Sequence, residues 1–277
     1  MNVLSLFDGM SCGQIALERV GIKVDNYFAS EIDKYAIQVT QNNYPNTKQV
    51  GSVTEIKCKD LPKIDLLIGG SPCQSFSRGG DGSGFDGKSK LFWEYVRILK
   101  ETKPKYFLLE NVKMKREWQD VISEALGIEP IFIDSSLITA GRRERLYWTN
   151  IPNIQQPKDK GIVLNDILEK TVEQKYYLSD KRINLIFNGV KYGLTNKICD
   201  RNGKSFTLSA SMGMGGGYEP KIKDKGTYRK LTPIECERLQ TVPDNYTDQV
   251  SNSQRYKMLG NGWTVDVIAH IFKNLKN

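Results

Sequence analysis

Cys73 is the residue of this chain with the strongest case for direct chemistry. It lies in the segment 69–77, Gly-Gly-Ser-Pro-Cys-Gln-Ser-Phe-Ser, directly after a continuous apolar run at 64–68. Such a run predicts a buried strand, and the cysteine should stand at its carboxyl end with Pro72 restricting the backbone before it. A thiolate is a strong nucleophile for an electron-poor ring carbon. We therefore predict a catalytic cysteine, although structural cysteines are commoner in general.

Charged side chains flank two later apolar segments. Glu110 follows the apolar run 106–109, so we expect its carboxyl to be partly buried, to hold a proton near neutral pH and to donate it. Arg143 and Arg145 begin the strand pattern at 145–148. Guanidinium groups at that point can make paired hydrogen bonds to a carboxylate, a phosphate or a base carbonyl.

The N-terminal segment has the features of a cofactor-binding turn. At 5–13 an apolar strand pattern runs into Gly9 and then a helix, which brings backbone N–H groups close to a ligand. The segment lacks the glycine spacing of the dinucleotide fingerprint. Glu31 stands at the end of the second predicted strand, where a carboxylate can accept hydrogen bonds from both ribose hydroxyls. Together these residues favour an adenosine-type ligand over the alternative, a solvated loop glutamate.

The elements that must position these residues alternate between strand and helix. Apolar or β-rich runs at 3–7, 24–29, 64–68, 106–109, 130–133 and 145–148 are interleaved with helical periodicity at 14–20, 33–43, 91–100 and 117–126. This alternation predicts an α/β fold with a mostly parallel sheet covered on both faces. Ligands of such sheets bind beyond the carboxyl ends of the strands, where all the motifs above lie.

The pattern changes after about residue 151. Residues 153–228 are rich in lysine, asparagine and glycine with weak periodicity, and helical signals return from 229. We therefore predict a catalytic domain made of 1–152 plus 229–277 and a small, loop-rich lobe at 153–228.

Composition narrows the functional class. Forty lysines and arginines against 32 acidic residues give a net charge of +8, which favours an anionic partner such as nucleic acid, although a lysine-rich protein without such a partner fits equally well. The five scattered cysteines argue against disulfides and structural zinc and favour a reducing cytosol. The single histidine, His270, sits in an apolar helical pattern, so histidine-based triads are nearly excluded. No apolar run is long enough for a membrane span, and we expect a cytoplasmic protein.

The ordered motifs resemble those of the DNA (cytosine-5)-methyltransferase family. Five short motifs occur in the family's order, and 229–238 is similar to its late structural motif; the five are Phe7-Asp8-Gly9, Pro72-Cys73-Gln74, Glu110-Asn111-Val112, Arg143-Glu144-Arg145 and Gly260-Asn261-Gly262. The match covers nearly the whole chain except 153–228. The compact length of the chain is similar to that of bacterial or phage enzymes. Several short segments are similar to those of the animal de novo methyltransferases.

The resemblance implies a Rossmann-like methyltransferase sheet and a mechanism. Cys73 would attack carbon 6 of cytosine, Glu110 would hold ring N3 and the amino group, and Arg143 and Arg145 would orient the base and Glu110. S-adenosylmethionine would be the methyl donor and S-adenosylhomocysteine the product, with no metal. The implied cofactor pocket comprises Phe7, Gly9, Met10, Ser11, Glu31, Ile32, Ser52, Val53, Pro72, Leu91, Asn261, Gly262 and Trp263. Departures from the usual family residues occur at Cys12, Ile32, Ser52 and Gly141, which affects adenine binding more than the chemistry.

The implied macromolecular partner is double-stranded DNA. We expect the lobe at 153–228 to choose the target sequence and the glycine-rich segment 74–90 to close over the flipped base. The expected DNA contacts are Gln74, Ser75, Ser77, Arg78, Lys204, Ser209, Ser211, Met212 and Gly213, with Lys221, Lys223 and Lys225 as flanking phosphate contacts. The glycines of 213–217 could instead only turn a hairpin. We expect a monomer on DNA, with a partner restriction nuclease possible. Two alternatives stay open: methylation of a tRNA cytosine, as in the family's RNA-acting branch, and a non-catalytic DNA-binding homologue.

Overall fold

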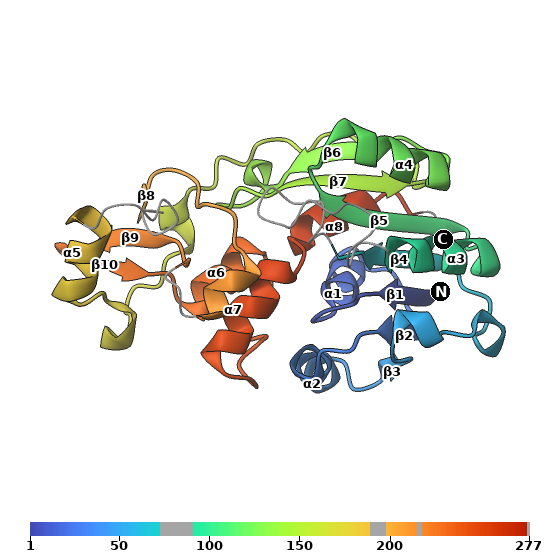
Figure 1. Cartoon of the computed structure of the whole chain (residues 1–277), viewed down its shortest axis with the longest axis horizontal. Helices are drawn as coiled ribbons and strands as arrows, with labels where there is room; N and C mark the ends of the chain where they lie inside the picture. Colours follow the sequence, from blue (N-terminus) through green and yellow to red (C-terminus); the bar gives the residue numbers. More distant parts are fainter. Residues whose placement is uncertain (73–90, 189–197, 215–217, 276–277) are drawn as a thin grey trace. The chain divides into compact units, whose positions relative to one another are not determined.

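The computed structural model describes residues 1–72, 91–188, 198–214 and 218–275 (Figure 1). These residues form two compact units. The first comprises Met1–Asp134, Glu144–Gln156 and Val267–Asn277, and the second comprises Ser135–Arg143 and Pro157–Asp266. Residues 229–266 thus belong to the second compact unit, whereas the sequence analysis assigned residues 229–277 to the catalytic domain.

The first unit is built on a seven-stranded sheet. Its strand order is β3-β2-β1-β4-β5-β7-β6. The bounds are β1 Asn2–Leu6, β2 Asn26–Ser30, β3 Lys48–Gln49, β4 Leu66–Gly70, β5 Tyr106–Val112, β6 Ile131–Asp134 and β7 Glu144–Thr149. The chain leaves β1 toward β2 and β3, then crosses to the other side of β1 to form β4 and β5. The strand order therefore reverses between β1 and β4, and this reversal marks the crevice where ligands bind in such folds.

Most of this sheet is parallel, as predicted. Strands β1 to β5 pair in parallel, but β7 pairs antiparallel with both β5 and β6. The short strand β3 has no apolar run of its own, and the sequence reasoning missed it. It pairs with β2 through two residues only, so its existence depends on the neighbouring strand and not on its own pattern.

Helices follow the strands of the first unit. Their bounds are α1 Cys12–Arg19, α2 Lys34–Asn43, α3 Phe92–Thr102 and α4 Arg116–Leu126. Asp33 caps α2 by accepting the Tyr35 N–H at 2.9 Å. The largest helical contribution to the core comes from α3, whose Phe92 and Tyr95 are fully buried beside the strand residues Leu67 and Leu109. This packing fixes the carboxyl ends of β4 and β5, where the site begins.

The second unit has a three-stranded sheet and short helices. The strands are β8 Ile198–Cys199, β9 Lys221–Asp224 and β10 Thr227–Lys230, in the order β10-β9-β8. The α-helices are α5 Asp180–Asn188, α6 Pro233–Leu239 and α7 Asn252–Asn261. Short 3-10 turns complete it: η5 Ser135–Leu137, η6 Leu164–Ile167, η7 Gln174–Tyr176 and η8 Ala210–Met214.

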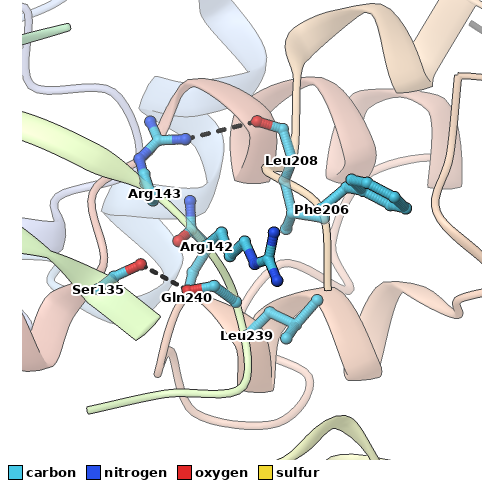
Figure 2. A pocket seen from close by; sticks show the side chains of 8 residues that line it. Ser135, Arg142, Arg143, Phe206, Leu208, Leu239 and Gln240 are labelled. Atoms are coloured by element: carbon cyan, nitrogen blue, oxygen red, sulfur yellow. Dashed lines mark hydrogen bonds between the residues drawn. The ribbon is translucent and has the colours of Figure 1, made fainter. Parts of the chain in front are cut away.

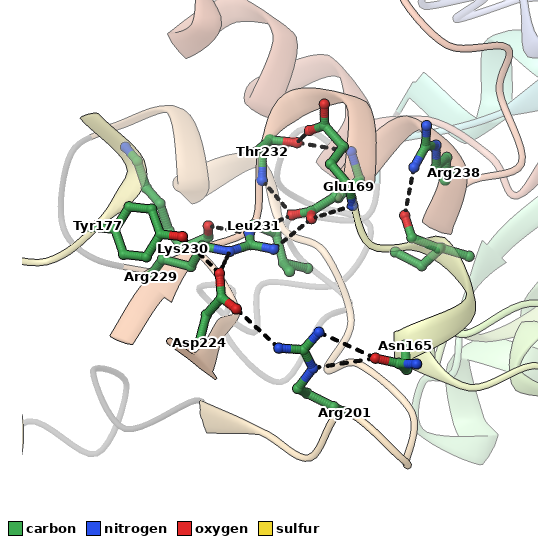
Figure 3. Close-up of polar contacts among 12 residues, drawn as sticks. Asn165, Glu169, Tyr177, Arg201, Asp224, Arg229, Lys230, Leu231, Thr232 and Arg238 are labelled. Carbon is green, nitrogen blue, oxygen red and sulfur yellow. Dashed lines mark hydrogen bonds and ion pairs between the residues drawn. The ribbon is translucent and has the colours of Figure 1, made fainter. Parts of the chain in front are cut away.

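The late motif at 229–238 forms a buried ionic network in this unit (Figure 3). Arg229, 1% exposed, donates to both Glu235 oxygens at 2.7 and 2.8 Å and to Asp224 at 2.9 Å. The Glu235 carboxylate also accepts the Thr232 N–H, which completes a capping box at the start of α6. Because the buried charges of Arg229 and Glu235 are paired and hydrogen-bonded, removing either partner would leave an uncompensated buried charge and destabilise the unit.

The last helix, α8 Val265–Phe272, carries His270. Its Nε2 lies 2.7 Å from the Gln155 carbonyl oxygen. The histidine therefore has a hydrogen-bond partner on the surface of the helix, and its position in a helix, expected from the sequence, is confirmed. Within the described ranges, no helix has both the length and the apolar character that crossing a bilayer requires.

Candidate active site

The turn after β1 has an unusual backbone. Phe7, Gly9 and Ser11 have φ values of 57°, 59° and 60°, in the left-handed region. Glycine tolerates this conformation, but Phe7 and Ser11 adopt it at an energetic cost. Strained non-glycine residues cluster at functional sites, where the surrounding contacts hold them in place.

Glu31 holds this turn from the end of β2. One carboxylate oxygen accepts the Gly9 N–H at 2.8 Å, and the other accepts the N–H groups of Ile32 and Asp33 at 2.7 and 2.8 Å. The Ile32 side chain beside it is 78% exposed. A carboxylate fixed by backbone amides next to an exposed apolar side chain fits a ribose and its attached base. The structure therefore brings together the turn at 7–9 and Glu31, as the sequence predicted.

Asp8 belongs to the same turn, and the sequence reasoning gave it no role. Its carboxylate accepts hydrogen bonds from the Tyr27 hydroxyl at 2.7 Å and from the Ser11 hydroxyl. Burial is the main influence on its charge and raises the pKa of Asp8 to about 6, against the opposing effect of these hydroxyl groups. The available signal was an acidic residue directly after an apolar strand. Asp8 acts as a brace between β2 and the turn.

The other predicted cofactor residues of the first unit differ in exposure. Met10 is 1% exposed, and Ser11 is fully buried. Ser52 begins the 3-10 turn η1 Val53–Glu55 and bonds the Thr54 hydroxyl at 2.8 Å. Val53 is 5% exposed in the hydrophobic core, and Leu91 packs partly buried against it. Pro72 follows β4, and Asn261, Gly262 and Trp263 lie at the end of α7 in the second unit.

Glu110 lies at the carboxyl end of β5, in register with Gly70 of β4. The side chain of the next residue, Asn111, donates to the Ser71 hydroxyl at 3.1 Å, which ties β5 to the segment following β4. Arg145 Nε is 2.7 Å from Glu110 Oε1, and both side chains are largely buried. The structure therefore brings Glu110, Arg145 and Ser71-Pro72 together at one edge of the sheet.

Cys73 itself lies outside the described residues. So do the predicted DNA contacts Gln74, Ser75, Ser77 and Arg78 and the predicted lid at 74–90. Four other cysteines are described. Cys12, Cys199 and Cys236 are buried, and burial raises the pKa of the Cys58 thiol to about 11. Burial likewise holds the pKa of Cys236 well above its usual value. Raised pKa values and burial make these thiols poor nucleophiles.

Arg143 is a cross-brace of the second unit (Figure 2). Its guanidinium donates to the carbonyls of Leu208, Gly260 and Asn261 at 3.2 to 3.4 Å. It also borders a small pocket, which is lined in addition by Ser135, Gly141, Arg142, Phe206, Leu208, Leu239 and Gln240. These carbonyl contacts give Arg143 a structural role that the sequence reasoning did not anticipate, beside its predicted role toward the base and Glu110.

Two lysines expected to contact phosphates support backbone carbonyl groups. Lys204 Nζ donates to the carbonyls of Ser136, Thr139 and Ile162 at 2.6 to 3.2 Å. Lys221 is 1% exposed and donates to the Glu219 carbonyl. The phosphate contact expected of Lys221 is corrected, because its charge is buried against the Glu219 carbonyl. Lys204 is partly exposed, and its DNA contact stays a prediction. Lys223 and Lys225 are exposed, as that expectation requires.

The expected base-reading turn is also corrected in part. Met212 is 2% exposed, so its side chain belongs to the interior and not to a groove of DNA. Gly213 does not have a positive φ; a Cβ there would lie 2.3 Å from the Ser253 carbonyl oxygen of α7. A glycine is required at position 213 because the backbone packs closely against α7. Ser209 and Ser211 share a hydroxyl–hydroxyl hydrogen bond of 2.8 Å, and both are partly exposed.

The chain combines a mostly parallel sheet whose strand order reverses between β1 and β4, a strained turn after β1 and a buried Glu110–Arg145 pair, and comparisons with known proteins give its family. The chain belongs to the C-5 cytosine-specific DNA methylase family, whose description matches residues 1–120 and 137–277. It is 34% identical to the Type II methyltransferase M1.ScrFI of Lactococcus lactis subsp. cremoris, over 99% of this chain and 77% of that protein. It is 33% identical to M.NlaX of Neisseria lactamica, over 99% and 96%.

Solved structures share the fold. The Entamoeba histolytica methyltransferase EhMeth has a TM-score of 0.82 at 20% identity, covering 100% of this chain and 99% of that one. The S. pombe Dnmt2 methyltransferase has a TM-score of 0.75 at 18% identity, covering 98% and 97%. The predicted family, α/β methyltransferase fold and enzyme class are thus confirmed. The roles of individual residues stay predictions.

Proposed function

We propose that this DNA cytosine-5 methyltransferase acts through a covalent adduct between Cys73 and carbon 6 of a flipped-out cytosine in a specific duplex sequence. The observation that carries the proposal is the convergence at the ends of β4 and β5. There the Asn111 side chain donates a hydrogen bond to the Ser71 hydroxyl, and Glu110 is paired with Arg145. Cys73 follows Pro72 directly in the sequence. The strand that leads to it, β4, pairs with β5, which carries Glu110.

The chemistry divides between these residues. The Cys73 thiolate forms a bond to carbon 6, and the electron pair of the 5,6 double bond becomes available at carbon 5. Glu110 holds a proton at ring N3 and so stabilises the charge that develops on the ring. Arg145 orients the Glu110 carboxyl. After the methyl group has joined carbon 5, the carbon 5 proton passes to solvent water. The electron pair of that C–H bond re-forms the 5,6 double bond, and Cys73 departs as the thiolate.

The turn after β1 and Glu31 fit S-adenosylmethionine. The Glu31 carboxylate is already fixed by three backbone N–H groups, two on Oε1 and one on Oε2, so Oε2 keeps one acceptor site for a ribose hydroxyl. Exposed Ile32 offers an apolar surface to the adenine. The bound cofactor supplies the electrophilic methyl group and leaves as S-adenosylhomocysteine; no metal takes part in this scheme. Residues of the first unit would hold its adenosine half.

The remaining cysteines support the choice of Cys73. Those that the structure describes are buried or have a raised thiol pKa, so none has the accessible thiolate that the reaction needs. We further propose that 153–228 supplies target choice, that the enzyme is monomeric on DNA, and that a restriction nuclease could act beside it as in restriction-modification systems.

The function is tested with labelled S-adenosylmethionine and two substrates, unmethylated duplex DNA and bulk tRNA. Methyl transfer to cytosine in DNA, with none to tRNA, is the expected result, and sequencing of the product gives the target site. Transfer to tRNA alone would replace the proposal with the RNA alternative. Cofactor and DNA binding without transfer would indicate a non-catalytic homologue.

A further inference from the structure

Two carboxylates flank Gly9 in the turn after β1, and neither forms an ion pair with a cation in the part of the chain that the structure describes. The hydrogen-bond partners of Glu31 are three backbone N–H groups, and those of Asp8 are hydroxyl groups. Glu110, by contrast, has a guanidinium partner of its own. Two negative groups without a protein cation favour a ligand that carries positive charge.

A chain of hydrogen bonds holds the Asp8 side chain in place. Oδ1 accepts the Tyr27 hydroxyl at 2.7 Å, and Oδ2 accepts the Ser11 hydroxyl. Gln14 Nε2 extends the chain, because it donates to the Ser11 hydroxyl at 3.1 Å and to the Thr47 hydroxyl at 2.8 Å. Both carboxylate oxygens act as acceptors, so a proton on Asp8 would have to reverse one of these hydrogen bonds. The arrangement therefore fits the ionised carboxylate.

The charge of Asp8 is nevertheless easily changed. Burial raises the pKa of Asp8 to about 6, with a further increase from the negative charge of Glu31, while the neighbouring hydroxyl groups lower it. The titratable groups that face Asp8 from β2 are Tyr27 and Glu31. On the helices beside the turn, α1 begins with the buried thiol of Cys12, and α2 contributes uncharged Thr40, which donates to the Gly9 carbonyl. A positive ligand at this turn would stabilise the ionised form of Asp8.

We propose that Asp8 makes the turn select the positively charged methyl donor, S-adenosylmethionine, over its product, S-adenosylhomocysteine. The proposal rests on the proposed binding of the cofactor at this turn. The two molecules differ by one methyl group and by the positive charge of the sulfonium, which the thioether of the product lacks. An ionised Asp8, held in a fixed position at the turn, attracts only the molecule that carries this charge. Asp8 thus acts on the choice between donor and product, and it needs no direct contact with either.

The test measures the Kd of both molecules by isothermal titration calorimetry without DNA. At pH 7 we expect Asp8→Asn to weaken S-adenosylmethionine about tenfold and S-adenosylhomocysteine at most about twofold, because asparagine keeps the shape of the side chain but not its charge. In the wild type the preference for S-adenosylmethionine should fall about fivefold from pH 7 to pH 5, as Asp8 takes up its proton. In Asp8→Asn this change with pH should be absent.

Proton release gives a second readout, which a merely structural role of Asp8 would not alter. Titrations at pH 6 in two buffers of different ionisation enthalpy should show that the wild type releases about 0.4 proton on binding S-adenosylmethionine and almost none on binding S-adenosylhomocysteine. Tyr27→Phe keeps the carboxylate but removes a hydroxyl that lowers the pKa of Asp8. The midpoint of the pH dependence should therefore move to higher pH in this variant.

Two controls separate charge from other effects. Asp60→Asn removes an exposed carboxylate elsewhere in the same unit and should leave the ratio of the two Kd values within about twofold of wild type. Sinefungin carries an ammonium group in place of the methylsulfonium. It should follow S-adenosylmethionine in every variant, because it shares the charge and not the methyl group.

The outcomes distinguish this inference from the proposed function. Equal weakening of both molecules by Asp8→Asn, or equal proton release with both, overturns the inference and leaves Asp8 as a brace of the turn. If Asp8→Asn does not fold, the wild-type pH dependence and the Tyr27→Phe shift decide, and a preference that is flat with pH overturns it. A wild type that binds neither molecule refutes the proposed use of the cofactor first.

Discussion

Arg145 and Glu110 form a direct ion pair, with Nε and Oε1 2.7 Å apart on the adjacent antiparallel strands β7 and β5. Their side chains are 13% and 10% exposed, so the pair is shielded from most solvent. A guanidinium in this position fixes the direction of the carboxyl group that we propose to contact ring N3.

Replacing Glu110 tests its part in the reaction. We expect Glu110→Gln to lower the rate of methyl transfer by about 10²–10⁴-fold, the usual contribution of a general acid, with little change in cofactor affinity. Arg145→Lys should give a smaller loss because lysine keeps the charge but not the fixed geometry of the guanidinium. Single-turnover rates and cofactor titration provide the measurements. A near-wild-type rate for Glu110→Gln would remove Glu110 from the mechanism.

Gly260 tests the packing between η8 and α7. Gly260→Ala places a methyl group against the Ser209 carbonyl carbon, and forced overpacking costs roughly 1–3 kcal/mol. We expect a lower Tm and weaker sequence discrimination together, because the same contact supports the turn that we assign to DNA. Gly203→Ala is the matched control, since its nearest neighbour atoms are 3.6 Å away. If both variants melt alike, the close contact is not as described.

Substitutions of Lys204 and Lys223 should have separate effects, one on the stability of the protein and the other on DNA binding. Lys204→Ala removes a cation that supports three carbonyl groups, so we expect lower stability and an unchanged salt dependence of DNA affinity. Lys223→Ala removes an exposed charge, so stability should stay within about 0.5 kcal/mol while the slope of log affinity against log salt falls by about 0.9. The reverse pattern would return Lys204 to the DNA surface.

Asp8 gives a pH dependence of stability whose sign is fixed by its pKa. Burial raises this pKa to about 6 from an ordinary 3.8, so the folded protein binds the proton more tightly than the unfolded chain between about pH 4 and pH 6. The stability contributed by the protonated form is therefore lost as pH rises through 6. Relative to wild type, Asp8→Asn should gain unfolding free energy from pH 4 to pH 7, by at most about 3 kcal/mol. Denaturant titrations at several pH values measure this difference; a difference that is flat with pH would contradict the assignment.

Much of the catalytic half could be predicted from sequence because its signals are local. Apolar runs ending at Gly70 and Leu109 indicated β4 and β5, and the residues directly after them were the predicted site. The antiparallel insertion of β7 between β5 and β6 had no such signal, because strand direction depends on pairing partners that a run of residues does not reveal.

The lobe that we propose to contact DNA was harder to predict for the same reason. Lys204 and Lys221 look like any other lysines in a basic segment, and only the fold turns their side chains inward. Met212 and Met214 have nearly the same sequence surroundings but opposite exposure, because the 3-10 turn η8 packs one side on α7. Sequence periodicity in such a short turn is too weak to separate a buried from an exposed position.

The central claim is that Cys73 forms a covalent bond to cytosine, and mechanism-based trapping tests it most directly. Wild-type enzyme, S-adenosylmethionine and a duplex carrying 5-fluorocytosine at the target should give an adduct that survives denaturing electrophoresis, because fluorine does not leave carbon 5 as a proton does. Peptide mapping should locate the DNA on Cys73, and Cys73→Ala should give no adduct while still binding the cofactor. The absence of an adduct in an enzyme that methylates the ordinary duplex, or an adduct on Cys12, Cys58, Cys199 or Cys236, would contradict the account.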